Sequence, residues 1–246
     1  MEEKHAIEVK DLVISYQNLK KTSIKKTLLH LKRQKPDRFV AVKGISFYVR
    51  EGEILGIIGK NGCGKSTTLN ALAGIFSPDS GTIDFIGHSI SLLSIGVGFQ
   101  REMTGRENIT LSGMLLGFTE EQVKAKEQEI IDFAEIGEFI DMPVRTYSSG
   151  YVFQTGFFPS TAILETDIML IDEVLSVGDQ KFKKKSYEKM KSLISNKDRT
   201  VVIVSHSIET LKQLCDTVMW MHEGQIKRIG DPDEVLDEYV ALWKKS

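Results

Sequence analysis

A glycine-rich loop that ends in lysine and serine is the part of this sequence best suited to chemistry. Residues 59–66 read Gly-Lys-Asn-Gly-Cys-Gly-Lys-Ser and match the G-x-x-x-x-G-K-S pattern of a phosphate-binding loop. In such loops the backbone N–H groups surround the phosphates, the lysine contacts the terminal phosphates and the serine hydroxyl binds Mg²⁺. The residues predicted to bind nucleotide here are Gly59, Asn61, Gly62, Cys63, Gly64, Lys65, Ser66 and Thr67. The loop therefore predicts a nucleoside triphosphate site in which Ser66 is a metal ligand.

A second group of reactive side chains follows an apolar run. Residues 168–171 are all apolar, as in a buried parallel strand, and the acids Asp172 and Glu173 follow directly. The first acid can hold Mg²⁺, and the second can orient the attacking water as general base. Gln100 offers an amide oxygen to the metal, and His206, which follows another strand-like run, can contact the γ-phosphate. Together these residues predict hydrolysis of the bound triphosphate.

The segments around these residues have the patterns needed to position them. Residues 53–58 before the loop are typical of a buried strand, and residues 68–75 after it have helical composition. Residues 7–16 and 40–49 also have strand patterns. The order strand, loop, helix is the context that a phosphate-binding loop requires.

The middle of the chain is predicted to be mainly helical. Thr104 and Glu107 have the spacing of a capping box, which opens a helix, and helical patterns continue to about residue 164. Before this stretch, Pro78-Asp79-Ser80-Gly81 predicts a turn between two strands.

Composition excludes several classes of protein. The 246 residues hold 32 basic and 34 acidic side chains, a balance that argues against a nucleic-acid-binding protein. One of the two cysteines, Cys63, lies inside the phosphate loop, where a disulfide to Cys215 would obstruct the nucleotide, so a reducing cytoplasm is expected. The sequence shows no signal peptide and no run of about 18–20 apolar residues. Any membrane role is expected to act through a partner or a surface contact.

Residues 17–38 differ in composition from the rest of the chain. Eight basic residues and one acid, Asp37, give this segment a charge of about +7. Ile24, Leu28 and Leu31 recur at helical spacing, which favours a short amphipathic helix. We interpret it as an interfacial helix near the membrane, where 20–38 could meet anionic lipid headgroups. An ordinary solvated loop is the alternative.

The ordered set of motifs resembles the nucleotide-binding subunit of an ABC transporter over essentially the whole chain. The set is the phosphate loop, Gln100, Ser148-Ser149-Gly150, Asp172-Glu173, Asp179 and His206. The resemblance implies one α/β domain over 1–246: a P-loop NTPase (RecA-like) core, an ABC antiparallel β subdomain and an α-helical subdomain at 101–164. It also implies ATP and Mg²⁺ as ligands, with Ser66, Gln100 and Asp172 around the metal and Glu173 and His206 as catalytic residues.

The same resemblance implies an assembly. In this family two subunits enclose two ATP molecules, and Ser148 and Gly150 would reach the nucleotide held by the other copy. An aromatic residue stacks on adenine, and Tyr16 is the candidate, with Phe39 as its rival. The expected assembly is a homodimer of this ATPase with two copies of a transmembrane permease, peripheral to the cytoplasmic face of the plasma membrane.

Three short segments around these motifs are similar in sequence to ATPases that export cell-envelope polymers. The segments 103–109, 147–150 and 175–180 are the ones that carry this similarity. They imply export of a lipid-linked polymer, with wall teichoic acid favoured and capsular or O-antigen polysaccharide as the alternative.

The signature segment departs from the family pattern at three places. Gln154 takes an arginine position, and Pro159 is expected to shorten or bend the helix, because a proline inside a helix costs about 3 kcal/mol. Tyr151 also differs from the pattern. Slow hydrolysis, or a regulatory subunit with impaired hydrolysis, is therefore a further alternative. A soluble ABC-type ATPase of DNA repair or translation is disfavoured, since the chain has neither a long coiled coil nor two cassettes in tandem.

Overall fold

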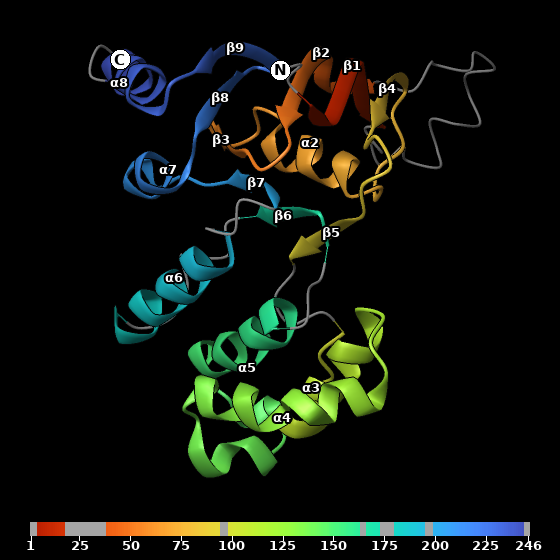
Figure 1. The fold of residues 1–246 in the computed structure, drawn as a ribbon, viewed down its shortest axis with the longest axis vertical. Helices are drawn as coiled ribbons and strands as arrows, with labels where there is room; N and C mark the ends of the chain where they lie inside the picture. The colour runs from red at the N-terminus through yellow and green to blue at the C-terminus, as the bar shows by residue number, and fades with distance from the viewer. Residues whose placement is uncertain are drawn as a thin grey trace, which may run out of the picture.

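The structure is a computed structural model that describes residues 4–17, 38–93, 98–162, 166–172, 180–194 and 199–243 (Figure 1). It contains two sheets. In the smaller, antiparallel sheet the strand order is β2 (Arg38–Arg50), β1 (His5–Gln17), β4 (Ser80–Asp84). The larger sheet has the order β5-β6-β7-β3-β8-β9. Its strands are β5 (Ile90–Leu93), β6 (Ile168–Asp172), β7 (Thr200–Val204), β3 (Ile54–Ile58), β8 (Thr217–His222) and β9 (Gln225–Gly230).

The larger sheet is parallel except for its last pair, β8 and β9. Its central strands β6, β7 and β3 are almost entirely buried, which explains why they are apolar without alternation. Helix α2 (Lys65–Leu72) lies between the two sheets, and its Leu69 and Leu72 are buried in a core shared with both (Figure 1). Helices α6 (Gln180–Ile194), α7 (Ile208–Leu214) and α8 (Pro232–Trp243) complete the core region.

Three helices form a group at the end of the molecule away from β1 and β2 (Figure 1). They are α3 (Gly105–Leu115), α4 (Glu120–Ala134) and α5 (Ser149–Ala162), with short 3₁₀ turns at Gly137–Asp141 and Val144–Thr146. The group has its own core, which includes Ile109, Val123 and Ile130. The predicted capping box is confirmed: the Thr104 side chain accepts from Glu107 N, and Glu107 bonds back to Thr104 N.

The fold class predicted from the sequence is confirmed, but the predicted turn at Pro78–Gly81 is wrong. Ser80 and Gly81 belong to β4, because this segment pairs with β1 at Val13 and the Asp79 side chain accepts from Ser15 N. The hairpin β8–β9 and helix α8 were not predicted. The division of the chain, with a helical subdomain at 101–164, stays a prediction.

The membrane-related prediction concerns a part of the chain that is largely not described. Residues 18–37 of the predicted basic segment lie outside the described residues. Within the described ranges, no helix is long and apolar enough to cross a bilayer.

Candidate functional site

The phosphate-binding loop borders a cavity of about 400 Å³. The residues around this cavity come from the ends of β1 and β2, from the loop with the start of α2, and from the residues after β7. They are Tyr16, Phe39, Ala41, Asn61, Gly62, Gly64, Lys65, Ser66, Thr67 and His206. Predicted residues that are far apart in the sequence therefore meet at one place.

The loop conformation depends on glycine at Gly64, the residue before α2. Gly64 has φ 107°, a region that residues with a side chain rarely adopt, and a Cβ added there would lie 2.7 Å from the Ala41 carbonyl oxygen. The backbone can consequently turn tightly between β3 and α2. This places the N–H groups of the first helical turn beside the cavity.

Lys65 is 5% exposed, although lysine is almost never buried without partners. Its Nζ donates to the carbonyl oxygens of Gly59 and Lys60, at 2.9 and 3.1 Å. The loop thus holds the ammonium group in place while the cavity remains open beside it. Backbone N–H groups, one ammonium group and the hydroxyls of Ser66 and Thr67 are a donor and ligand set that fits a triphosphate with Mg²⁺.

Both candidates for the adenine-stacking residue border the cavity. Tyr16 and Phe39 are cross-strand partners on β1 and β2. The Tyr16 hydroxyl lies 2.9 Å from Thr67 Oγ1, and the Tyr16 ring makes an edge contact with Phe76 at 5.7 Å. Phe39 is 53% exposed and so is the freer of the two rings. Which ring stacks on a base stays open.

The strand order places Asp172 and His206, two further predicted site residues, at the same edge of the larger sheet as the phosphate loop. Strand β7 lies between β6 and the loop strand β3, and Asp172 is in register with Val204. Asp172 ends β6 and His206 follows β7, so both lie at the carboxyl edge, where ligands bind in open α/β sheets. Glu173 and Asp179 lie outside the described residues.

Gln100 does not line the cavity, and its position is set by a residue whose role the sequence did not reveal. The buried Asn108 side chain accepts from Gln100 N at 2.6 Å and donates to Gln100 O at 3.0 Å. It also donates to the carbonyl oxygens of Met103 and Thr104. The only sequence signal for this role of Asn108 was its position as a polar residue in the first turn of a predicted helix.

Ser148 and Gly150 lie at the start of α5, in the helical group rather than at the loop cavity (Figure 1). Ser148 is exposed, and its Oγ accepts from Tyr151 N at 3.2 Å, as in a helix cap. Within one chain, the structure does not bring these residues to Lys65.

The predicted shortening of the signature helix is wrong, and a bend at Pro159 stays a prediction. Helix α5 runs for 14 residues from Ser149 to Ala162 and includes Pro159. Proline lacks one backbone donor, so the helix loses one hydrogen bond there, while the neighbouring bonds keep it continuous. Gln154, at the position where the family has arginine, is 8% exposed and therefore faces the interior.

Cys63 is not an activated thiol. Burial raises the pKa of Cys63, and the nearby charge of Lys65 lowers it by less. A nearby lysine lowers the pKa of a thiol, but burial outweighs that effect here. Position 63 lies close to the backbone of Gly59, because a Cβ added at Gly59 would lie 2.5 Å from the Cys63 sulfur. The side chain at position 63 must therefore be small.

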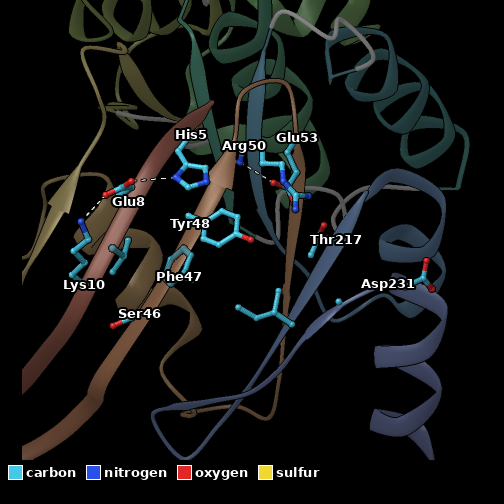
Figure 2. A pocket seen from close by; sticks show the side chains of 13 residues that line it. His5, Glu8, Lys10, Ser46, Phe47, Tyr48, Arg50, Glu53, Thr217 and Asp231 are labelled. Atoms are coloured by element: carbon cyan, nitrogen blue, oxygen red, sulfur yellow. Dashed lines mark hydrogen bonds and ion pairs between the residues drawn. The ribbon is translucent and has the colours of Figure 1, made fainter. Parts of the chain in front are cut away.

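A larger cavity of about 720 Å³ lies between β1, β2 and the end of β9 (Figure 2). Three of its polar side chains are engaged with one another: Glu8 accepts from Lys10 at 2.8 Å and lies 3.1 Å from His5 Nδ1. Tyr48 stacks on His5, with ring centroids 4.3 Å apart. None of the functional residues predicted from the sequence lines this cavity. The smaller cavity at the phosphate loop is therefore the candidate site.

Comparison with known proteins agrees with this geometry. Residues 42–176, more than half of the chain, match the family model described as ABC transporter. The chain therefore belongs to the ABC transporter family. It superposes with a TM-score of 0.72 on the dimeric ATP-binding cassette MJ0796 bound to ADP and Pi, at 20% identity, covering 92% of this chain and 98% of that one.

Two curated relatives are similar over most of this chain. The O-antigen export system ATP-binding protein RfbB of Myxococcus xanthus is 42% identical over 243 residues, covering 95% of this chain and 55% of the relative. The teichoic acids export ATP-binding protein TagH of Bacillus anthracis is 46% identical over 205 residues, covering 83% of this chain and 37% of the relative. The chain thus spans about half or less of the length of these relatives.

Proposed function

We propose that this chain is the ATP-binding and ATP-hydrolysing subunit of an ABC exporter for a lipid-linked cell-envelope polymer, with wall teichoic acid as the favoured cargo. The observation that carries the proposal is the meeting of the phosphate loop, Tyr16, Phe39 and His206 at one cavity. The similarity to export ATPases supports the transport role.

In this proposal Lys65 and the loop N–H groups hold the terminal phosphates of ATP. Ser66, Gln100 and Asp172 are the side chains that would surround Mg²⁺, which when bound neutralises charge on the phosphates. Glu173 is the general base and His206 contacts the γ-phosphate. The comparisons do not support the alternative of a regulatory subunit with impaired hydrolysis, and the continuous α5 removes one reason for it.

A homodimer is part of the proposal, because Ser148 and Gly150 lie apart from Lys65 in a single chain. Ser148 is exposed and Gly150 is partly exposed at the start of α5, which suits contact with the nucleotide bound to a second copy. The structural neighbour MJ0796 is itself dimeric, which is consistent with such an arrangement.

A transmembrane permease, in two copies, is the proposed membrane partner. Three exposed apolar side chains of the helical group, Met114, Leu115 and Met142, are 51%, 56% and 42% exposed and offer a surface for it. The subunit would then be peripheral on the cytoplasmic face, with 20–38 toward anionic headgroups.

The catalytic part of the proposal is tested with Glu173→Gln. Removing the general base should lower ATP turnover by about 10²–10⁴-fold and leave ATP affinity nearly unchanged. A structure of this variant with MgATP should place Lys65 of one copy and Ser148 of the other on the same terminal phosphate. Unchanged turnover would refute the base assignment, and a loaded dimer with those side chains far apart would refute the shared site.

The cargo is tested by complementation. The gene should restore polymer export in a strain that lacks its teichoic acid exporter ATPase, when expressed with its own permease. The second candidate is an O-antigen or capsular polysaccharide, which is favoured by the 42% identity to the Myxococcus protein. Rescue only in a strain that lacks the O-antigen exporter would select that candidate.

A further inference from the structure

A cluster of charged side chains joins the helical group to helix α6. Glu135 Oε2 lies 2.7 Å from Lys181 Nζ, and Glu135 Oε1 lies 2.5 Å from Lys185 Nζ. Lys185 Nζ also donates to the Phe133 carbonyl oxygen at 3.0 Å and lies 4.6 Å from the centre of the Phe133 ring. We call Glu135, Lys181 and Lys185 the clamp.

The clamp is built on the end of α4, where the last carbonyl groups have no partner within the helix. Lys185 donates to one of these carbonyls, and a cation there also interacts favourably with the helix dipole. Glu135 has φ 52° and ψ 32°, the left-handed conformation in which glycine is usual at a helix end. A glutamate held there costs conformational energy, and its carboxylate faces both lysines.

An apolar contact accompanies the charged one. Phe182, on the same face of α6, is 3% exposed and meets the Phe133 ring edge-on at 5.7 Å. The two lysines also hold the pKa of Glu135 at about 2, so the carboxylate stays charged at any physiological pH. The clamp is therefore a defined contact between α4 and α6.

The position of the clamp in the chain links the two halves of the proposed ATP site. Helix α6 belongs to the core and begins seven residues after Glu173. Helix α4 packs against α5, which starts beside Ser148. We propose that the clamp sets the orientation of the helical group relative to the core, and so positions Ser148 and Gly150 for the nucleotide of the second copy. This inference rests on the proposed function, and the clamp residues act as positioning residues.

Two variants remove the clamp with little change of shape: Glu135→Gln, and Lys185→Met, which keeps the alkyl stem on Phe133. Lys185→Arg keeps the charge and serves as the conservative variant. Lys184→Met is the matched control, because Lys184 is an exposed lysine one position away on α6. All are made in the full chain and measured with the permease complex for turnover and ATP affinity, and without nucleotide by hydrogen–deuterium exchange.

Glu135→Gln and Lys185→Met should lower turnover about threefold to tenfold with ATP affinity within about twofold of the wild type. Exchange at 130–137 and 180–190 should rise in both variants. Lys185→Arg and the Lys184 control should match the wild type. In about 1 M NaCl, where the Debye length falls to about 3 Å, the wild type should approach the variants.

The inference is overturned if hydrogen–deuterium exchange or ATP turnover in both clamp variants equals that of the wild type. It is also overturned if Lys184→Met loses as much turnover as the clamp variants do. Exchange needs no nucleotide, so it separates this inference from the proposed function. If the wild-type chain neither binds nor hydrolyses ATP, the proposed function fails. The positioning role then fails with it, whatever the exchange result.

Discussion

Asn108 holds both backbone groups of Gln100: its Oδ1 accepts from Gln100 N at 2.6 Å, and its Nδ2 donates to Gln100 O at 3.0 Å. The side chain is fully buried at the start of α3. The proposed metal ligand therefore sits on a segment fastened to the first turn of the helical group. Under the proposed function, this arrangement would tie the metal site to the position of that group.

Asn108→Asp should destabilise the chain by about 2–3 kcal/mol. The added carboxylate keeps the acceptor for Gln100 N but faces the carbonyl oxygens of Gln100, Met103 and Thr104 without a proton to donate. Urea unfolding measures the free energy change. Gln128→Ala, at an exposed site on α4, should change it by less than about 0.5 kcal/mol. Equal stability of Asn108→Asp and the wild type would contradict the assigned hydrogen bonds.

Lys65→Ala should lower ATP affinity about 10–100-fold, because a hydrogen bond from a charged donor to phosphate contributes about 1.5–3 kcal/mol. Titration with a fluorescent ATP analogue measures the loss. Lys124→Ala is the control, since Lys124 is exposed on α4 and pairs with Glu120. Near wild-type affinity in Lys65→Ala would mean that ATP does not bind at this loop.

Tyr16→Ala and Phe39→Ala should separate the two candidates for base stacking. Loss of the stacking ring should lower ATP affinity about tenfold, because stacking a base on an aromatic ring contributes about 1–3 kcal/mol. Affinity for tripolyphosphate, which has no base, should not change. Tyr16→Phe removes only the hydroxyl that meets Thr67 and tests that hydrogen bond separately. If neither alanine variant distinguishes ATP from tripolyphosphate, neither ring stacks on adenine.

Both cysteines should resist alkylation at neutral pH in the folded chain. Burial raises the pKa of Cys63, and burial raises the pKa of Cys215 to about 12, so both remain thiols rather than reactive thiolates. Iodoacetamide labelling followed by mass spectrometry should show slow modification of the native chain and rapid modification in urea. Fast labelling of native Cys63 would show that the thiol is ionised.

The raised pKa of Cys215 also predicts a loss of stability in alkali. The folded chain holds this proton more tightly than the unfolded chain, whose thiol has a pKa of about 8.5. The stabilising contribution is thus complete below about pH 8.5 and is lost as the pH rises toward 12. Urea unfolding between these values should show a smaller decline in Cys215→Ala than in the wild type.

The sequence by itself determined the ligand class, the family and the fold class. The ligand class follows from local patterns, namely the spacing of Gly59 to Ser66 and the acids after an apolar strand, and the family and fold class follow from the resemblance that the ordered motifs carry. Such patterns act through backbone geometry and side-chain chemistry over a few residues. They could be read without knowing what packs against them.

Tertiary structure decided everything that depends on residues far apart in the chain. It brought Tyr16, Phe39 and His206 to the loop cavity and made Ser80 and Gly81 part of β4 through pairing with β1. Burial, which no local pattern reports, raised the pKa of Cys63 although Lys65 lies nearby. The Asn108 bonds to Gln100 and the clamp at Glu135 likewise depend on how helices pack, because hydrogen bonds and ion pairs form only where folding brings their partners together.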